Sequence, residues 1–249
     1  MRDEACGRYS RKGVTLSISP GGIFDRCFVR VQRALPANCV LCGAASLFQC
    51  LCRACDEALP RLPLSQCRSC ALPLASGQIC GTCLSAPPAY DGVTAAFVYD
   101  FPVDALIQKF KYGPDLTLAP VLGRLPGNTP CGEIDAVLAM PLGAARLRDR
   151  GFNQAQELAR VAARIRGVPL LARACRKVSD TPPQAGLPWK ERAANVRGSF
   201  VCDADLRGQR VAIVDDVMTT GATVGELARV LKRAGALSVH VWVLARTLR

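Results

Sequence analysis

The segment from Val211 to Thr223, VAIVDDVMTTGAT, constrains the possible fold of this chain more narrowly than any other. Its first residues are apolar and branched, as in a buried strand, and two adjacent acids, Asp215 and Asp216, follow them. A loop of small and hydroxylated residues leads into a helical pattern that ends near Ala234, and another strand is expected over Ser238–Ala245. Strand, helix and strand at this length predict an α/β fold with a parallel sheet.

The preceding part of the chain shows the same alternation of patterns. A helix is expected over Asn153–Arg166, with Asn153 as its N-cap and Gly167 as its stop, because apolar residues recur there at helical spacing. A shorter helix carries Leu106, Ile107 and Phe110 and ends near Gly113. The other expected strands are Gly92–Asp100, Asp135–Met140 and Arg210–Val214.

The acid pair and the loop after it have the composition of a sugar-phosphate site. Ligands of parallel sheets bind at the carboxyl ends of the strands, where Asp215 and Asp216 are expected. These two candidate catalytic residues can accept hydrogen bonds from two vicinal ribose hydroxyls. The loop amides and hydroxyls, with the N-terminus of the next helix, can hold a 5-phosphate. This candidate phosphate loop consists of Thr219, Thr220, Gly221, Ala222 and Thr223.

Other folds that bind phosphate or Mg2+ fit less well. Receiver domains also place adjacent acids at a strand end, but that fold needs more strand and helix units than the chain after Asp216 provides. The P-loop motif G-x4-G-K-[ST] and the dinucleotide fingerprint G-x-G-x-x-G are absent from the sequence. A sugar-phosphate site remains the preferred interpretation.

A cysteine-rich segment precedes the expected sheet. Eight of the 14 cysteines form four C-x2-C pairs, and a shift of 28 residues places the first two pairs on the last two. The repeat predicts one small unit used twice, each with four thiolates that can surround a Zn2+ ion. The candidate ligands are Cys39, Cys42, Cys52 and Cys55 in one unit, and Cys67, Cys70, Cys80 and Cys83 in the other. Cys50 could substitute as a ligand, and one or two ions are possible.

Disulfides are the alternative use of these cysteines. The N-terminus lacks the continuous apolar region of a secretory signal, so the chain is expected in the cytoplasm, where thiols stay reduced. Metal binding is therefore favoured over disulfides. A four-thiolate site has no open position for a substrate, which indicates a structural or docking role.

Composition excludes some functions and leaves others open. The formal net charge of +12 makes phosphates natural partners, on a metabolite, a nucleic acid or a membrane surface. The one histidine, His240, is expected to pack within its strand, and sites that need two imidazoles are excluded. The uncharged stretch Ala34–Cys52 nearly has the length of a membrane span, but a proline, polar residues and four cysteines interrupt it. We therefore expect no transmembrane segment there.

Several motifs together resemble the ComF family. The Val211–Thr223 segment has the signature of type I phosphoribosyltransferases, with two aliphatic pairs, two acids and a T-T-G-A-T-like loop. The stretches FKYG at 110–113, RGFNQA at 150–155 and TPPQAGL at 181–187 also match, and the resemblance runs from about Pro36 to Arg249. It implies a phosphoribosyltransferase fold, with a Rossmann-like parallel core and a hood, plus an N-terminal zinc-ribbon module.

The resemblance also implies ligands and further site residues. Members of the family are linked to DNA uptake in natural transformation. The ligand would be phosphoribosyl pyrophosphate or a related ribose phosphate, bound with Mg2+. The loop after Met140 would lie near the pyrophosphate, and residues 176–197 match a loop that closes over the site. Candidate contacts are Arg146, Arg148, Arg150 and Arg192, with Arg150 preferred because Gly151 permits close approach. A surface role is preferred for Lys109 and Lys111.

Two functions of different classes follow. The first is transfer of a phosphoribosyl group to an unidentified acceptor, plausibly a base. The second is a non-catalytic accessory protein of the competence machinery that binds a nucleotide or single-stranded DNA, with competence proteins as possible partners. The expected organisation is an unassigned segment over 1–35, a double zinc-ribbon-like module over 36–88 and a phosphoribosyltransferase domain over 89–249.

Overall fold

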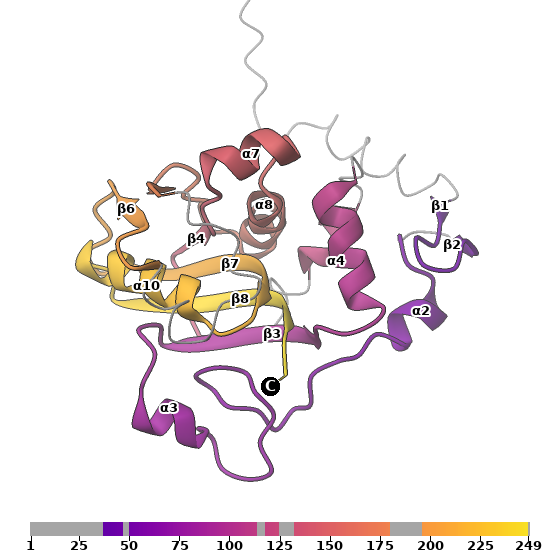
Figure 1. Ribbon diagram of the computed structural model, residues 1–249, viewed down its shortest axis with the longest axis horizontal. Coiled ribbons are helices and arrows are strands. Elements are labelled where there is room, and N and C mark those ends of the chain that lie inside the picture. The colour runs from indigo at the N-terminus through magenta and orange to yellow at the C-terminus, as the bar shows by residue number, and fades with distance from the viewer. Residues whose placement is uncertain (1–36, 47–49, 114–117, 125–131, 180–195, 249) are drawn as a thin grey trace, which may run out of the picture.

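The computed structural model describes residues 37–46, 50–113, 118–124, 132–179 and 196–248 (Figure 1). The N-terminal segment 1–35, the TPPQAGL stretch and Arg192 lie outside the described residues. Figure 1 shows a central sheet with α4, α7 and α8 above it, and the unit around α3 below it. None of the helices in the described part of the chain combines the length and apolar composition of a membrane span.

The central sheet has four parallel strands in the order β3-β8-β7-β4. Their bounds are β3 Gly92–Val98, β4 Ala136–Ala139, β7 Arg210–Met218 and β8 Ser238–Arg246. The middle of β7 and most of β8 are fully buried apolar residues, as expected for strands covered on both faces. The α/β fold with a parallel sheet is therefore confirmed.

The strand β7 is longer than its apolar run predicts. Beyond Val214, the residues Asp215, Val217 and Met218 remain paired with β8. The two acids consequently lie on the strand and not after it. Because neighbouring residues of a strand point to opposite sides, the two carboxylates have different surroundings.

The helices follow the expected pattern, and additional short ones are present. The side chain of Asn153 accepts a hydrogen bond from Ala155 N at 3.0 Å, and Gly167 ends the same helix with a φ of 66°. Both the start and the stop of this helix are thus confirmed. The helices of the sheet-forming part are α4 Val103–Tyr112, α5 Ala119–Leu122, α7 Ala144–Arg150, α8 Gln154–Arg166 and α10 Ala222–Arg233.

A topological switch point lies between β4 and β7. After β4, the chain passes through α8 and returns at Leu170, which forms a parallel bridge with Val137 on the outer side of β4. After β7, the chain passes through α10 and returns as β8 on the other side. Right-handed crossovers in opposite directions place α8 and α10 on opposite faces of the sheet. Their preceding loops therefore diverge, and a crevice opens between them.

A small antiparallel pair adjoins this crevice. Strand β5, Cys175–Lys177, pairs with β6, Phe200–Cys202, and Lys177 lies opposite Phe200. Gly198 N donates to Glu226 Oε1 of α10 at 2.9 Å, which fixes the segment before β6 against that helix. The pair forms one side of the crevice, and Arg176 and Lys177 of β5 begin the stretch that, according to the resemblance, closes over the site.

The cysteine-rich segment consists of two similar units, as the repeat predicts. The first contains the two-residue strands β1, Ala37–Asn38, and β2, Ala45–Ser46, and helix α2, Arg53–Glu57, and the second contains α3, Gly81–Ser85. Cys39 N donates to Ala44 O at 2.7 Å, and 28 residues later Cys67 N donates to Leu72 O at 2.8 Å. The same turn is therefore built twice.

Each unit brings its four cysteine sulfurs together. In the first cluster (Cys39, Cys42, Cys52, Cys55) and in the second cluster (Cys67, Cys70, Cys80, Cys83), the sulfur atoms lie within 4.8 Å of one another. Cys80 N donates to the sulfur of Cys67 at 3.3 Å. Burial alone would raise the pKa of the Cys67 thiol, but hydrogen bonds from backbone amides outweigh burial and lower this pKa to about 7. The same two effects act on Cys39, and its pKa is lowered to about 6. Thiolates held by amides suit a Zn2+ ion.

The cysteine-rich segment also covers an edge of the sheet. Arg61 forms an antiparallel bridge with Phe97 of β3, and Val98 N donates to Pro60 O at 2.8 Å. An edge strand with unpaired backbone groups would otherwise invite pairing with another chain. The segment is therefore hydrogen-bonded to the sheet along β3.

Two clusters predict two zinc ions per chain. Replacing Cys52 and Cys55 by Ser should lower the zinc content from two ions to one, because two thiolates do not complete a tetrahedral site. Elemental analysis of the gel-filtered protein measures this. Cys175→Ser with Cys202→Ser is the matched control, since that pair lies outside both clusters, and it should keep both ions. An unchanged zinc content in the first variant would contradict the prediction.

Candidate functional site

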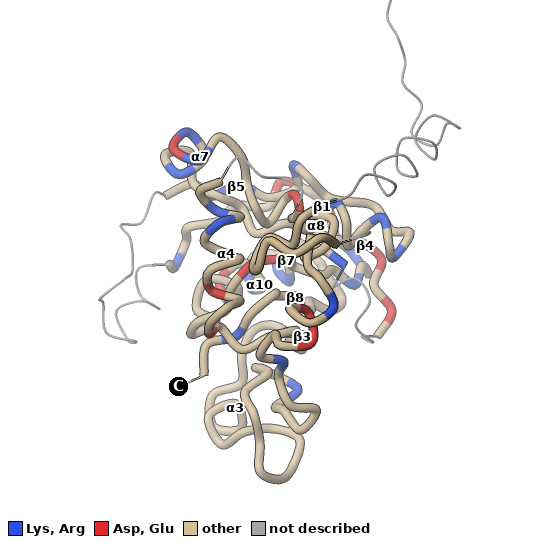
Figure 2. The backbone as a smooth tube through the Cα atoms, turned by 90° about the vertical axis from the view of Figure 1, so that its right-hand side faces the viewer, with Lys and Arg blue, Asp and Glu red and all other residues tan. Residues whose placement is uncertain are grey.

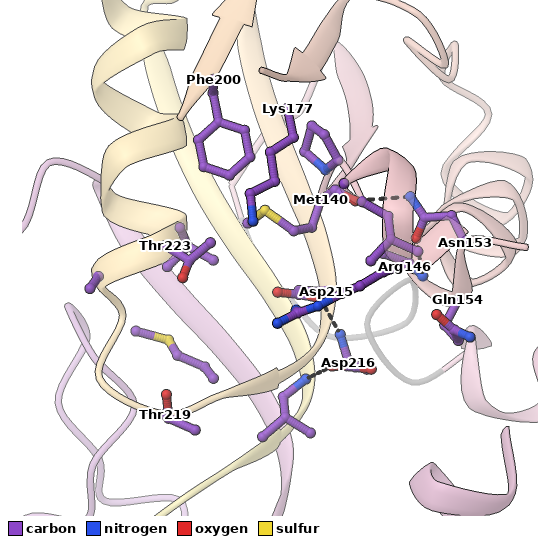
Figure 3. Close-up of a pocket in the computed structure, with 18 of the residues that line it drawn as sticks. Met140, Arg146, Asn153, Gln154, Lys177, Phe200, Asp215, Asp216, Thr219 and Thr223 are labelled. Carbon is purple, nitrogen blue, oxygen red and sulfur yellow. Dashed lines mark hydrogen bonds between the residues drawn. The ribbon is translucent and has the colours of Figure 1, made fainter. Parts of the chain in front are cut away.

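The candidate site is a cleft of about 200 Å3 at the carboxyl ends of β4 and β7. In Figure 3, Asp215 and Asp216 lie at its centre, with Thr219 and Thr223 on one side and Arg146, Asn153 and Gln154 on the other. Lys177 and Phe200 from the β5–β6 pair lie at its upper end in this view. The fold thus collects residues from segments that are far apart in the sequence.

The candidate phosphate loop, residues 219–223, forms one wall of the cleft. Gly221 has a φ of 80° and precedes α10, a conformation that glycine adopts without strain. A Cβ atom at this position would lie 2.7 Å from the Tyr90 hydroxyl and 2.6 Å from Met218 Cε, so a side chain there would displace these two groups. The amides of the first turn of α10 have no partners within the helix, and they can bind an anion.

The two acids of the cleft differ in their surroundings. Asp216 Oδ2 lies 2.9 Å from Lys111 Nζ, and Asp215 Oδ1 accepts a hydrogen bond from Asp216 N at 2.9 Å. Burial and the neighbouring charge of Asp216 raise the pKa of Asp215 to about 7, against the hydrogen bond from Asp216 N and the charges of Lys111 and Arg150. A buried carboxyl of this kind ionises readily only when a cation or a hydrogen-bond donor approaches.

Lys111 lies in the cleft, whereas the sequence favoured a surface role for it. Its side chain is 18% exposed and forms the ion pair with Asp216. The side chain of Gln154 donates to Lys111 O at 3.1 Å, which holds the end of α4 against the start of α8. The position of this lysine is therefore set by a tertiary contact.

The three arginines expected near a pyrophosphate all belong to α7, but they lie on different faces of this helix. Arg146 and Arg150 line the cleft, whereas Arg148 is exposed and does not line it. Residues four apart share one helix face, and the residue midway between them points away. Arg150 NH1 donates to Gln154 Oε1 at 3.1 Å, and its guanidinium lies 5.2 Å from the centre of the Tyr112 ring.

Gly151 follows Arg150 at the end of α7. It ends α7 with a φ of 76°, and a Cβ atom there would meet no other atom within 4 Å. Glycine adopts this left-handed conformation without strain, and close approach to a ligand at this position stays a prediction.

Sequence reasoning missed several residues of the cleft. Asn153 is more than a helix cap, because its Nδ2 also donates to Met140 O at 3.0 Å and so joins the end of β4 to α8. The RGFNQA stretch contains Asn153 and Gln154, so a signal for both was present. Lys177 lies near the start of the stretch that the resemblance places over the site, and it enters the cleft with Phe200 through the pairing of β5 with β6.

Comparison with known proteins agrees with this geometry. The family model described as "Phosphoribosyl transferase domain" matches residues 149–249, which include the cleft strand β7 and the phosphate loop. The DNA utilization protein YhgH of Salmonella typhimurium is 33% identical over 207 residues, covering 80% of this chain and 91% of the relative. Competence protein F of Haemophilus influenzae is 32% identical over 208 residues, covering 79% of this chain and 90% of the relative.

A more distant relative extends the same similarity. The competence protein ComFC of Streptococcus pneumoniae is 26% identical over 226 residues, covering 84% of this chain and all of the relative. The similarity thus reaches well beyond the matched domain and into the cysteine-rich segment. The chain belongs to the ComF family of competence protein F, with a phosphoribosyltransferase-type α/β fold and two four-cysteine clusters that suit an N-terminal zinc module.

Proposed function

We propose that the cleft binds phosphoribosyl pyrophosphate with Mg2+, and that the protein is a cytoplasmic phosphoribosyltransferase that acts in DNA uptake. One observation carries the proposal: a glycine-containing loop at the start of α10 follows two acids on the same strand, and cationic side chains face them across one cleft. An anion-binding loop next to hydroxyl-binding carboxylates matches a ribose 5-phosphate.

Each part of the ligand has suitable partners among the described residues. Residues 219–223 would hold the 5-phosphate, and Asp215 and Asp216 would accept hydrogen bonds from the ribose hydroxyls. Arg146 and Arg150 lie on the opposite wall, where they would neutralise the pyrophosphate. Lys111 would position Asp216 through their ion pair.

The donor set also suits Mg2+. The ion prefers carboxylate and phosphate oxygens, and two carboxylates line the cleft. When bound, it would neutralise charge that develops as pyrophosphate leaves. The arginines would stabilise the same charge from the protein side.

A second candidate function uses the same cleft without turnover. The names of the relatives, a DNA utilization protein and competence proteins, support a role in handling DNA. The net charge of +12 supports contact with phosphates, but no charged residue occurs between Ser69 and Tyr90. Figure 2 accordingly shows no basic residue around α3. Arg68 of the unit around α3 is exposed at the end that adjoins β3, so nucleic acid held by charge would contact that end and the sheet-forming part, and not α3.

Phosphoribosyl pyrophosphate with Mg2+ should raise the melting temperature of the protein, because a ligand that binds only the folded state stabilises it. At a ligand concentration of about 100 times Kd, the free energy of unfolding rises by about 2.7 kcal/mol. Asp215→Asn with Asp216→Asn should abolish the shift, as measured by scanning fluorimetry. Asp203→Asn with Asp205→Asn removes the same charge from exposed positions and should leave the shift intact. An equal shift in the cleft variant would exclude the site assignment.

The raised pKa of Asp215 predicts a pH-dependent stability. The folded protein keeps a proton on this group that the unfolded chain loses above about pH 4, so stability falls as pH rises toward about 7 and then levels. The expected loss is about 1–4 kcal/mol. Chemical denaturation at several pH values measures it, and the Asp215→Asn variant removes this contribution. Parallel pH profiles for the two proteins would contradict the prediction.

Turnover separates the two candidate functions. A transferase should release pyrophosphate when phosphoribosyl pyrophosphate, Mg2+ and a suitable base are present, and a coupled phosphate assay with a panel of bases measures this. No release with any base, while the melting shift persists, would favour the non-catalytic function. Fluorescence anisotropy with single-stranded DNA at two salt concentrations then tests that function, because binding through phosphates weakens as salt rises.

A further inference from the structure

We infer that the metal ion of the second cluster controls the affinity of the phosphate loop, and that Arg246 is the positioning residue between them. The inference rests on the proposed function, since it concerns the same loop. It adds a regulatory contact to that function, in which a metal site outside the cleft governs ligand binding inside it.

Arg246 joins the two structures directly. It is the last residue of β8, is only 5% exposed and pairs with Met218 at the end of β7. Its Nε donates to Cys70 O at 2.9 Å, and Cys70 belongs to the second cluster. Its NH1 donates to Met218 O at 3.1 Å and also to Thr219 O. One buried guanidinium therefore holds carbonyl groups of the metal unit and of the phosphate loop.

Tyr90 provides a second contact on the same side of the loop. The tyrosine is 6% exposed, and its hydroxyl lies against Gly221. Between the second unit and the loop is a cavity of about 410 Å3, lined by Cys70, Cys80 and Cys83 and by residues 219–222. Because this cavity separates the second unit from the phosphate loop, the two are not packed against each other throughout. Arg246 and Tyr90 are residues through which they are in contact.

The first cluster offers a comparison within the same chain. Figure 1 places β1, β2 and α2 beside α4, at the other end of the cysteine-rich segment from α3. Its backbone hydrogen bonds from Cys39 N to Ala44 O and from Val40 N to Cys50 O stay within the first unit. A metal ion there would stabilise that unit, whose described residues form no comparable bridge to the phosphate loop.

Metal binding can reach the loop through backbone order. Four thiolates that bind one ion fix the turn that contains Cys70, and so they fix the carbonyl that Arg246 binds. Without the ion, the guanidinium loses a fixed acceptor in a buried position, which is costly. The carbonyl of Thr219 would then be held less firmly, whereas Met218 O keeps its hydrogen bond from Thr247 N. A less ordered loop binds phosphate more weakly, because binding must supply the missing order.

Two double variants test the inference. Cys80→Ser with Cys83→Ser empties the second cluster, and Cys52→Ser with Cys55→Ser empties the first. Circular dichroism and zinc analysis verify the fold and the remaining ion, and calorimetry measures the affinity for ribose 5-phosphate. We expect the second-cluster variant to bind about fivefold more weakly or worse than the wild type. The first-cluster variant should show a clearly smaller change.

The wild-type protein provides a test that needs no folded cluster variant. Coupling between sites is reciprocal, so ribose 5-phosphate should raise the zinc affinity of the second cluster by the same factor. Competition with a chromogenic chelator, with and without ribose 5-phosphate, measures the zinc retained at equilibrium. Arg246→Lys should remove the effect of the ligand. Arg229→Lys is the matched control, because Arg229 lines the same cavity but pairs with Glu226 of its own helix.

The outcomes distinguish failure of the inference from failure of the proposed function. If the wild-type protein binds neither ribose 5-phosphate nor phosphoribosyl pyrophosphate with Mg2+, the proposed function is wrong. If it binds only the latter, that ligand replaces ribose 5-phosphate in both tests. If it binds, but both cluster variants lose equal affinity, the second cluster has no special role and the inference is overturned. Should the second-cluster variant not fold, the chelator competition decides. Zinc retention that does not depend on the ligand in the wild type would then overturn it.

Discussion

The parallel pairing of β4 with β7 is the constraint on which the site depends. Ala139, the last residue of β4, pairs with Val214, and β7 continues beyond this pair to Met218. One strand continues into α7 and α8, and the other continues into the phosphate loop and α10, in opposite directions across the sheet. A cleft at this point receives an acid pair and an anion-binding loop from β7, and basic side chains from α7.

Local patterns predicted most of the elements that form this arrangement. The start and stop of α8 are encoded by Asn153 and Gly167, which act on neighbouring backbone groups alone. The parallel strands follow from apolar runs of the right length. The two cysteine clusters follow from spacing, since a repeated turn brings the same thiolates together twice. These features need no knowledge of distant contacts.

Features set by tertiary contacts could not be predicted in this way. The apolar run predicts that β7 ends at Val214. Pairing with β8 extends the strand to Met218, and this pairing is not visible in the apolar pattern. Lys111 is one of two similar lysines on α4, and its ion pair with Asp216, which the sequence does not reveal, brings its side chain into the cleft. Arg148 points away from the cleft while Arg146 and Arg150 line it, and this difference can be predicted only once α7 is known to be a helix. Periodicity reveals such a face only where apolar residues mark it.

The central sheet and the second cysteine unit are stabilised in different ways, and Arg246 connects them. The sheet is held by burial, and Val241, Trp242 and Val243 of β8 are fully buried. The second cysteine unit has a small core of its own, formed by Cys67, Cys70 and Cys83, so metal binding would supply much of its folding energy. A contact from such a unit is formed or lost together with its ion. Because Arg246 anchors the phosphate loop to the second unit, the order of the loop depends on the metal ion of that unit. A loop anchored only to the sheet would keep its order without the ion.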